Sequence, residues 1–159
     1  MPIYMHIEGI KGEVTESKHK DWVEIGSVQF GVGRAISSAV GAGKTREASL
    51  PSVSEITVTK MMDGASVEMF KWAVGGSEGK KVKIDFVSTG GKESQTYLLL
   101  ELEKVMLSGY SMSSGGDKPS ESCSLNFTKI LYKYVQQDET GKAQGPKAAS
   151  YDLQTAIPG

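Results

Sequence analysis

Apolar and polar residues alternate with a period of two along several short stretches of this chain, which is the pattern of β-strands with one buried face. The first stretch places Ile3, Met5 and Ile7 on one face and ends at Gly9 and Gly12. The chain has 19 glycines, and many lie between such stretches, as turns lie between strands. The pattern predicts a chain dominated by β-strands.

Two shorter strands are predicted at residues 54–61 and 81–88. Apolar residues alternate with polar ones, at Ile56 and Val58 in the first and at Val82, Ile84 and Phe86 in the second, which is typical of a sheet with one buried and one solvated face. In the second strand the remaining positions include Lys81, Lys83 and Asp85. These three side chains are therefore expected to face water.

Three longer stretches, residues 22–32, 98–107 and 123–134, keep the period of two but shift its phase partway along. A strand that changes phase needs one extra residue, so each stretch predicts a β-bulge, the first of them near Gly26. Closed and coiled sheets use such bulges to turn their corners. We therefore expect a mainly β fold: a closed or nearly closed β-barrel of two sheets.

One flanking α-helix is predicted at about residues 64–74. Asp63 is suited to accept a backbone N–H at its start, and Gly75-Gly76 are suited to end it in a left-handed turn. Apolar residues recur at helical spacing within it. Those expected to face inward are Val67, Phe70 and Val74, with Met69, Trp72 and Ala73 alongside.

The length of 159 residues fits a single domain spanning 1–159. Two segments depart from the strand pattern. Residues 34–49 form a long loop without strand or strong helix pattern, and residues 136–159 form a C-terminal tail that is polar and turn-rich before a possible last strand near Tyr151. Either segment could become ordered only within an assembly.

Charge and cysteine content narrow the function classes. Eighteen Lys and Arg stand against nineteen Asp and Glu, which offers no basic face for nucleic acid. A single cysteine predicts no internal disulfide, and no apolar run approaches the roughly 20 residues of a membrane span. The N-terminal residues lack the pattern of a secretory signal peptide. The expectation is a protein made and folded in the cytoplasm that, if exported, leaves folded by another route.

Residues 41–45 read Gly-Ala-Gly-Lys-Thr, which is similar to the end of a phosphate-binding P-loop. The full motif needs a glycine at the position of Ser38 and a helix directly after the threonine, and Pro51 follows too soon for that helix. A nucleotide-dependent enzyme therefore stays a minor alternative, which an ATP or GTP binding assay addresses.

The sequence lacks the residues that a zinc site or a catalytic cysteine would need. His6 and His19 are the two histidines and Cys123 the one cysteine, which is too few for a zinc site of three His or Cys ligands. Cys123 alternates in phase with Leu125 and Phe127, so a small buried residue is expected there rather than a nucleophile. No enzyme, cofactor or metal site is predicted.

Four stretches carry a resemblance to a known family. They are Ile10-Lys11-Gly12-Glu13 with His19 and Trp22-Val23-Glu24-Ile25; Ile56-Thr57-Val58-Thr59-Lys60 leading into Met62-Asp63; Tyr97-Leu98-Leu99-Leu100-Glu101-Leu102; and Glu121-Ser122-Cys123-Ser124-Leu125-Asn126-Phe127 continuing to Lys129-Ile130. In this order they resemble the haemolysin co-regulated proteins (Hcp), which form the tube of the bacterial type VI secretion system. Together the stretches run through nearly the whole chain.

The resemblance implies a β-barrel subunit of a hexameric ring with a central channel. Rings stack into a tube that a contractile sheath propels out of the cell from a baseplate, behind a trimeric spike protein (VgrG). Small effector proteins travel in the channel, and the tube protein is itself secreted without a signal peptide. The expected partners are therefore other copies of the chain, spike, sheath and baseplate proteins, and effectors.

The resemblance also suggests roles for particular residues. Gln29 and Gly31 are expected to line the channel, and Tyr132 and Tyr134 are candidates for the lateral contact between subunits, although both tyrosines could equally lie in the core. The long loop is expected to reach a neighbouring ring. Its candidate stacking residues are Arg34, Val40, Lys44 and Arg46. The main alternative from another class is a monomeric β-barrel carrier that encloses a small apolar ligand.

Overall fold

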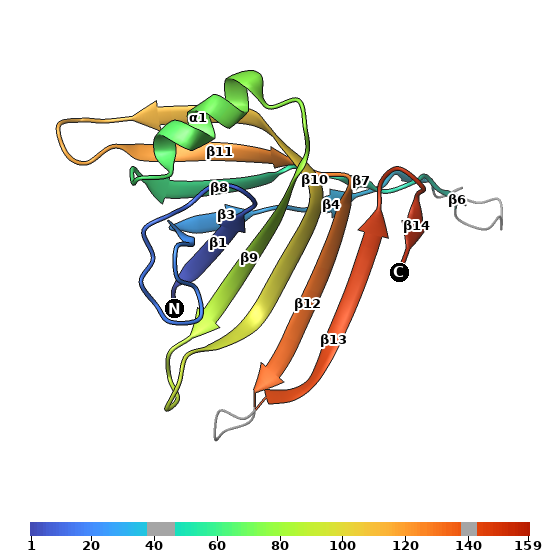
Figure 1. Cartoon of the computed structure of the whole chain (residues 1–159). Helices are drawn as coiled ribbons and strands as arrows, with labels where there is room; N and C mark the ends of the chain where they lie inside the picture. Colours follow the sequence, from blue (N-terminus) through green and yellow to red (C-terminus); the bar gives the residue numbers. More distant parts are fainter. Residues whose placement is uncertain (38–46, 138–142) are drawn as a thin grey trace.

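The computed structural model describes residues 1–37, 47–137 and 143–159 (Figure 1). Fourteen strands and one helix lie within them. The strands are β1 (Ile3–Ile7), β2 (Val23–Ile25), β3 (Ser27–Gln29), β4 (Val32–Gly33), β5 (Ile36–Ser37), β6 (Glu47–Ala48), β7 (Ser52–Val53), β8 (Ile56–Met61), β9 (Lys80–Ser88), β10 (Gln95–Ser113), β11 (Ser120–Asn126), β12 (Lys129–Gln137), β13 (Ala143–Asp152) and β14 (Ile157–Pro158), and the helix is α1 (Ser66–Gly75). The prediction of a mainly β chain with one short helix is confirmed for these residues.

Ten strands are joined by antiparallel pairing, and the 19-residue strand β10 is the centre of the arrangement. The first part of β10 pairs with β9 on one side and β12 on the other, and its last part pairs with β11. The main path of paired strands has the order β14-β13-β12-β10-β11-β8-β3. A branch leaves it at β10, where β9 pairs with β10, β1 with β9, and β2 with β1. This path of paired strands ends at β14 and at β3, so the pairing itself does not form a closed ring.

The predicted phase shifts mark real changes in strand pairing. At Gly26 the chain breaks into β2, which pairs with β1, and β3, which pairs with β8. In β10 the register against β9 shifts between Leu102 and Val105. The third shift is not a bulge, which corrects the prediction: β11 and β12 are separate strands, and both pair with β10.

The apolar core lies between the two ends of this bent sheet and beneath the helix. Met5 on β1, Val58 on β8 and Leu125 on β11 are completely buried, and Met69 and Trp72 of α1 cover them from one side. Burial of this kind stabilises a fold by about 1.5–3 kcal/mol for each large apolar side chain. The same strands position the exposed surfaces described below.

The helix buries a different face from the predicted one. Val67, Phe70 and Val74 are 65%, 53% and 71% exposed, whereas Met69 and Trp72 are buried. Two apolar stripes compete in this segment, and the stripe with the larger side chains packs on the sheet. The buried stripe also contains Ser66, whose hydroxyl bonds to a buried carboxylate of β11 and fixes the rotation of the helix.

The helix termini also differ in part from the expectation. Asp63 Oδ1 accepts the N–H of Ala65 at 3.0 Å just before the helix, but Ala65 is the N-cap residue and no side chain caps the helix start, which corrects the prediction. Gly76 is extended (φ −78°, ψ 98°) rather than left-handed. Position 76 requires glycine because the Trp72 side chain lies so close to the backbone there that a Cβ would be 2.3 Å from Trp72 Cδ1.

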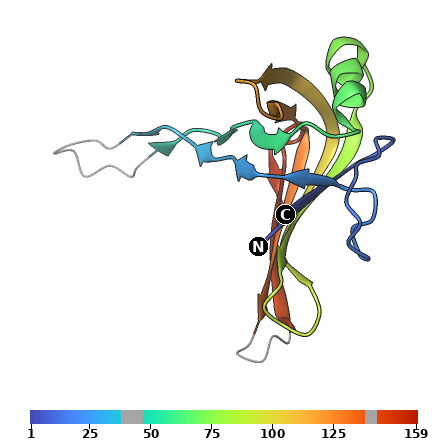
Figure 2. The ribbon, with the colours of Figure 1, turned by 90° about the vertical axis from the view of Figure 1, so that its left-hand side faces the viewer.

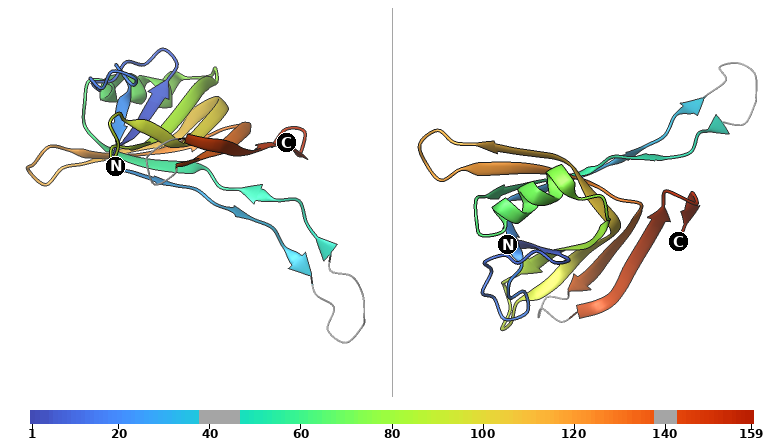
Figure 3. Two further views of the ribbon diagram at one scale, coloured as in Figure 1. Left: turned by 90° about the horizontal axis from the view of Figure 1, so that it is seen from below. Right: turned by 45° about the horizontal axis from the view of Figure 1, so that its top comes forward.

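The long loop is not structureless in its described parts, which corrects the prediction. β4 pairs with β7 and β5 pairs with β6, so the two sides of the segment form a narrow hairpin arm. Figures 2 and 3 show this arm projecting far from the rest of the molecule. The tail is likewise largely strand, since β12 extends to Gln137 and pairs along most of β13.

Candidate assembly surface

Tyr132 and Tyr134 lie on an uncovered part of the sheet. They follow Ile130 at every second position of β12, so all three point to the same face. Ile130 is 6% exposed, whereas the two tyrosines are each 45% exposed. The alternative that both tyrosines are core residues is therefore wrong, and two aromatic side chains are left half open to solvent.

An apolar hollow of about 640 Å³ lies beside Tyr132. It is bounded by the base of the arm and by the last strands of the sheet. Phe30 and Tyr132 meet there edge to face with ring centroids 5.9 Å apart. The other main lining side chains are Val32 and Val53 from the arm, and Ile130 and Tyr151 from the sheet.

The arm itself carries exposed apolar residues. Val32, Ile36 and Leu50 are 67%, 52% and 73% exposed. Arg34, between β4 and β5, is also exposed. The other predicted stacking residues, Val40, Lys44 and Arg46, lie outside the described residues, as does the P-loop-like stretch 41–45.

The two predicted channel residues lie in and just after β3. Gln29 is exposed and Val28 beside it packs on the core, so Gln29 points away from the core as expected. Gly31 is held by Ser54: its N–H donates to Ser54 Oγ and its carbonyl accepts from Ser54 N, both at 2.8 Å. A Cβ at Gly31 would meet nothing within 4 Å, so the surface there is open.

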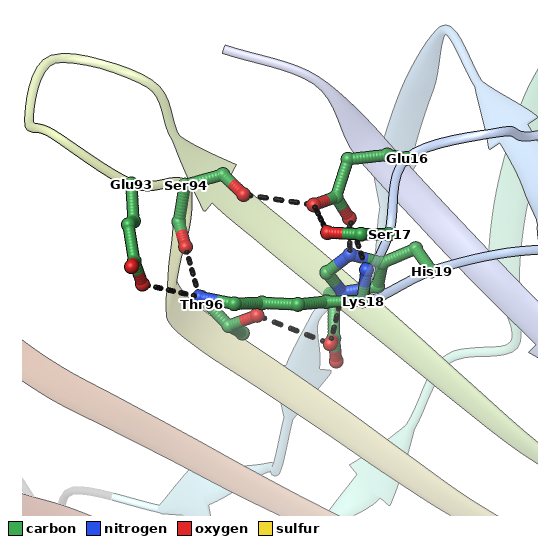
Figure 4. A network of polar contacts seen from close by, with 8 residues as sticks. Glu16, Ser17, Lys18, His19, Glu93, Ser94 and Thr96 are labelled. Atoms are coloured by element: carbon green, nitrogen blue, oxygen red, sulfur yellow. Dashed lines mark hydrogen bonds and ion pairs between the residues drawn. The ribbon is translucent and has the colours of Figure 1, made fainter.

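A polar network that the sequence did not reveal lies at one end of the sheet (Figure 4). The imidazole of His19 is buried between two carboxylates, with Nδ1 2.5 Å from Glu16 Oε2 and Nε2 2.8 Å from Asp85 Oδ2. Asp85 was expected to face water, but it is only 9% exposed because its carboxylate contacts the buried ring of His19. Ser94 Oγ donates to Glu16 Oε1 at 2.9 Å, and Thr96 Oγ1 donates to Asp85 Oδ2 at 3.1 Å.

The network shifts the acidity of its members. The hydrogen bond from His19 is the largest cause that holds the pKa of the Glu16 carboxyl at about 2, below its usual 4.5. Partial burial works against this shift, and hydrogen bonds from Ser94 and from the backbone of Lys18 add to it. Burial, and then the charges of Glu16 and Glu24, raise the pKa of Tyr4.

The described contacts fit structural rather than catalytic roles. Both ring nitrogens of His19 face carboxylates, so neither is paired with a hydroxyl that it could activate. Burial is the main cause that raises the pKa of the Cys123 thiol to about 12, which keeps it protonated and unreactive. Within the described residues no group of three or more His, Cys, Asp or Glu side chains is arranged to hold a metal ion. Nor does the helix described here have the length and apolar character that crossing a membrane requires.

Comparisons with known proteins agree on one family. The family model described as "Type VI secretion system effector, Hcp" matches residues 4–134. The protein hcp1 of Pseudomonas aeruginosa is 26% identical over 96 residues, a match that spans 59% of this chain and 59% of that protein.

Two solved structures show the same fold. One, described as a type six secretion system protein, superposes with a TM-score of 0.92 at 27% identity and covers 99% of both chains. Hcp1 from Salmonella typhimurium superposes with a TM-score of 0.78 at 23% identity, covering 97% of this chain and 95% of that one.

Proposed function

Because this chain belongs to the Hcp family of type VI secretion proteins, we propose that it is the structural subunit of a hexameric ring. Rings of this kind would stack into the secretion tube, which carries small effectors in its channel and is expelled by sheath contraction. As an Hcp protein it is a secreted component of the type VI system. Synthesis in the cytoplasm and export without a signal peptide are part of the proposal.

The observation that carries the proposal is the uncovered surface at Tyr132 and Tyr134, together with the apolar hollow beside Tyr132. Exposed apolar patches of this kind mark protein interfaces. A ring forms when one surface of a subunit contacts a different surface of the next and the rotation closes. We assign the two tyrosines to this lateral contact.

The arm supports the stacking part of the proposal. It projects beyond the body and exposes Ile36 and Leu50, which a solitary subunit leaves in water. We assign it, with Arg34, Val40, Lys44 and Arg46, to contact with a neighbouring ring. Gln29 on β3 and Gly31 just after it are assigned to the channel wall.

Closure of the sheet into a barrel is also proposed. β2 and β3 are separated only by Gly26, and they pair with β1 and β8 respectively. Continuity of the chain through Gly26 would then complete a circuit of strands through β9, β10 and β11. The Gly26 N–H donates to Thr59 O at 2.7 Å, which supports this junction.

The filled core favours assembly over the carrier alternative. Met5, Ile56, Leu100 and Leu125 are each at most 1% exposed and pack together in one cluster. A carrier needs an internal cavity for its ligand, and tightly packed side chains occupy that position. The proposed partners are accordingly other copies of the chain, the VgrG spike, sheath and baseplate proteins, and small effectors.

The proposal is tested by the solution mass of the purified protein, measured by light scattering and imaged by negative stain. A mass near six chains with annular particles is expected. A monomer that persists at high protein concentration would overturn ring assembly as an intrinsic property and would favour the carrier.

A further inference from the structure

We propose that His19 is a protonation-dependent latch that fastens the segment 11–22 to β9 and to the start of β10. The inference concerns the folded subunit and does not depend on ring assembly. The latch consists of the ring of His19 and the two carboxylates of Glu16 and Asp85.

With both carboxylates ionised, the geometry requires a donor on each ring nitrogen. Nδ1 lies 2.5 Å from Glu16 Oε2 and Nε2 lies 2.8 Å from Asp85 Oδ2. An ionised carboxylate only accepts hydrogen bonds, and an imidazole donates from both nitrogens only when it holds both protons. With both protons the ring is a cation that binds two anions, one on its own segment and one on β9.

The loss of one proton would leave the network short of a donor. Glu16, with a pKa of about 2, does not supply the missing proton. Asp85 Oδ2 already accepts from Thr96, and Asp85 Oδ1 is buried with no hydrogen-bond partner among the described residues. A neutral ring would add an unpaired contact to a site that already has one, and such contacts destabilise buried groups.

The ring also holds the other contacts of the segment in place. Glu16, once positioned by His19, accepts from Ser94 Oγ at 2.9 Å. Lys18 Nζ donates to Ser94 O at 2.8 Å and lies 3.5 Å from Glu93. Figure 4 shows these side chains converging from the segment and from the turn before β10. Release of the imidazole would loosen both sides of this junction.

The surroundings of the ring are mainly acidic or neutral, which suits a cation. From β1, the ring of Tyr4 lies 4.9 Å from that of His19. Trp22 stands edge-on to His19 at 4.7 Å and also meets the exposed His6. The charged and titratable groups around the site are Tyr4 and His6 on β1, Glu24 on β2 beside Tyr4, Glu16 and Lys18 on the segment, Asp85 on β9, and Glu93 before β10. Lys83 on β9 pairs with Glu101 instead.

The test uses the full chain and its two histidines. Imidazole nitrogen NMR at pH 6 is expected to show both nitrogens of His19 protonated. Amide exchange of residues 13–22, corrected for the intrinsic effect of pH, should then lose about tenfold in protection between pH 6 and pH 9. The exposed His6 provides the matched control, because His6→Gln should keep this pH dependence.

Two variants make the result decisive. His19→Gln should lower protection of the segment at pH 6 and remove its dependence on pH. Asp85→Asn offers an amide N–H to a neutral ring, so it should keep the segment protected and also remove the dependence on pH. A neutral His19 ring at pH 6, or a pH dependence that survives in both variants, would overturn the latch.

Discussion

Lys60 Nζ lies 2.6 Å from Glu121 Oε1, and both side chains are fully buried. Ser66, the first residue of α1, and Tyr110 of β10 donate hydrogen bonds to the same carboxylate, and Asp63 Oδ1 lies 3.0 Å from the ammonium. The ion pair thus joins β8, β11 and the start of the helix. Its burial makes each charge dependent on the other.

Removing one partner should be strongly destabilising. In Lys60→Met the carboxylate of Glu121 loses its nearest cation while it remains buried, so the free energy of unfolding should fall by about 3–5 kcal/mol. Urea unfolding followed by tryptophan fluorescence measures the change. The double variant Lys60→Met/Glu121→Leu removes both charges and should recover most of the loss.

The control is the exposed pair Lys71–Glu68 on the same helix, with side chains 67% and 52% exposed. Lys71→Met should change the free energy of unfolding by less than about 1 kcal/mol. If Lys60→Met and Lys71→Met had equal effects, the buried pair would not have the structural role given to it.

Protonation of Glu16 should make the protein less stable in acid. The pKa of Glu16 is about 2 in the folded protein and 4.5 without its partners. The stability that Glu16 adds to the fold is therefore complete above about pH 4.5 and is lost as the pH falls toward 2. In His19→Gln, carboxyl NMR should show the pKa of Glu16 rising toward 4.5, because the largest cause of the shift is removed. In the control His6→Gln it should stay near 2. A value near 2 in His19→Gln would show that other groups hold the carboxylate ionised.

The strand pattern of the sequence located most of the body of the fold. Period-two alternation places β1, β8 and β9 correctly, and the phase shift at Gly26 marks where the chain passes from β2 to β3. The pattern also contained a sign of one member of the buried ion pair, Lys60. Lys60 continues the inward phase of Ile56 and Val58, as the burial of β8 shows, but a charged residue was not expected to face the core.

Other features depend on contacts that local patterns do not contain. Asp85 shares its phase with solvated lysines, and its partner His19 is 66 residues away in the chain. The strands of the arm are two residues long, too short to show any period. On α1 two apolar stripes were available, and only the packing against the sheet decides between them.

Loss of the exposed tyrosines should prevent ring formation without unfolding the subunit. Tyr132→Ser/Tyr134→Ser removes two half-exposed aromatic rings from the proposed lateral contact. Light scattering should then report a monomer, while circular dichroism remains that of a β protein. Met112→Ser, at a 53% exposed position of β10, is the matched control and should keep the mass of the parent. Intact rings in the tyrosine variant would place the lateral contact elsewhere.

Shortening the arm should separate stacking from ring formation. Replacing residues 36–48 by a short turn removes β5 and β6 but keeps the pairing of β4 with β7 at the base. Single rings should remain in negative-stain images, while longer stacks become rarer. Shortening the turn at residues 114–118 serves as the control for loop removal. Loss of the rings themselves would show that the arm belongs to the lateral contact.

A large residue at position 29 should reduce cargo retention and leave the ring intact. Gln29 is exposed on β3 and points away from the core, so Gln29→Trp adds bulk on the proposed channel side without filling the interior. Light scattering should report the mass of the parent ring, and co-purification of effectors should fall severalfold, because the indole narrows the space and removes a polar contact. Ser111→Trp, at an exposed position on β10, controls for adding a tryptophan to a strand surface. Unchanged effector retention in Gln29→Trp with an intact ring would place Gln29 outside the channel wall, and a fall in Ser111→Trp as well would point to the outer surface as the site of cargo contact.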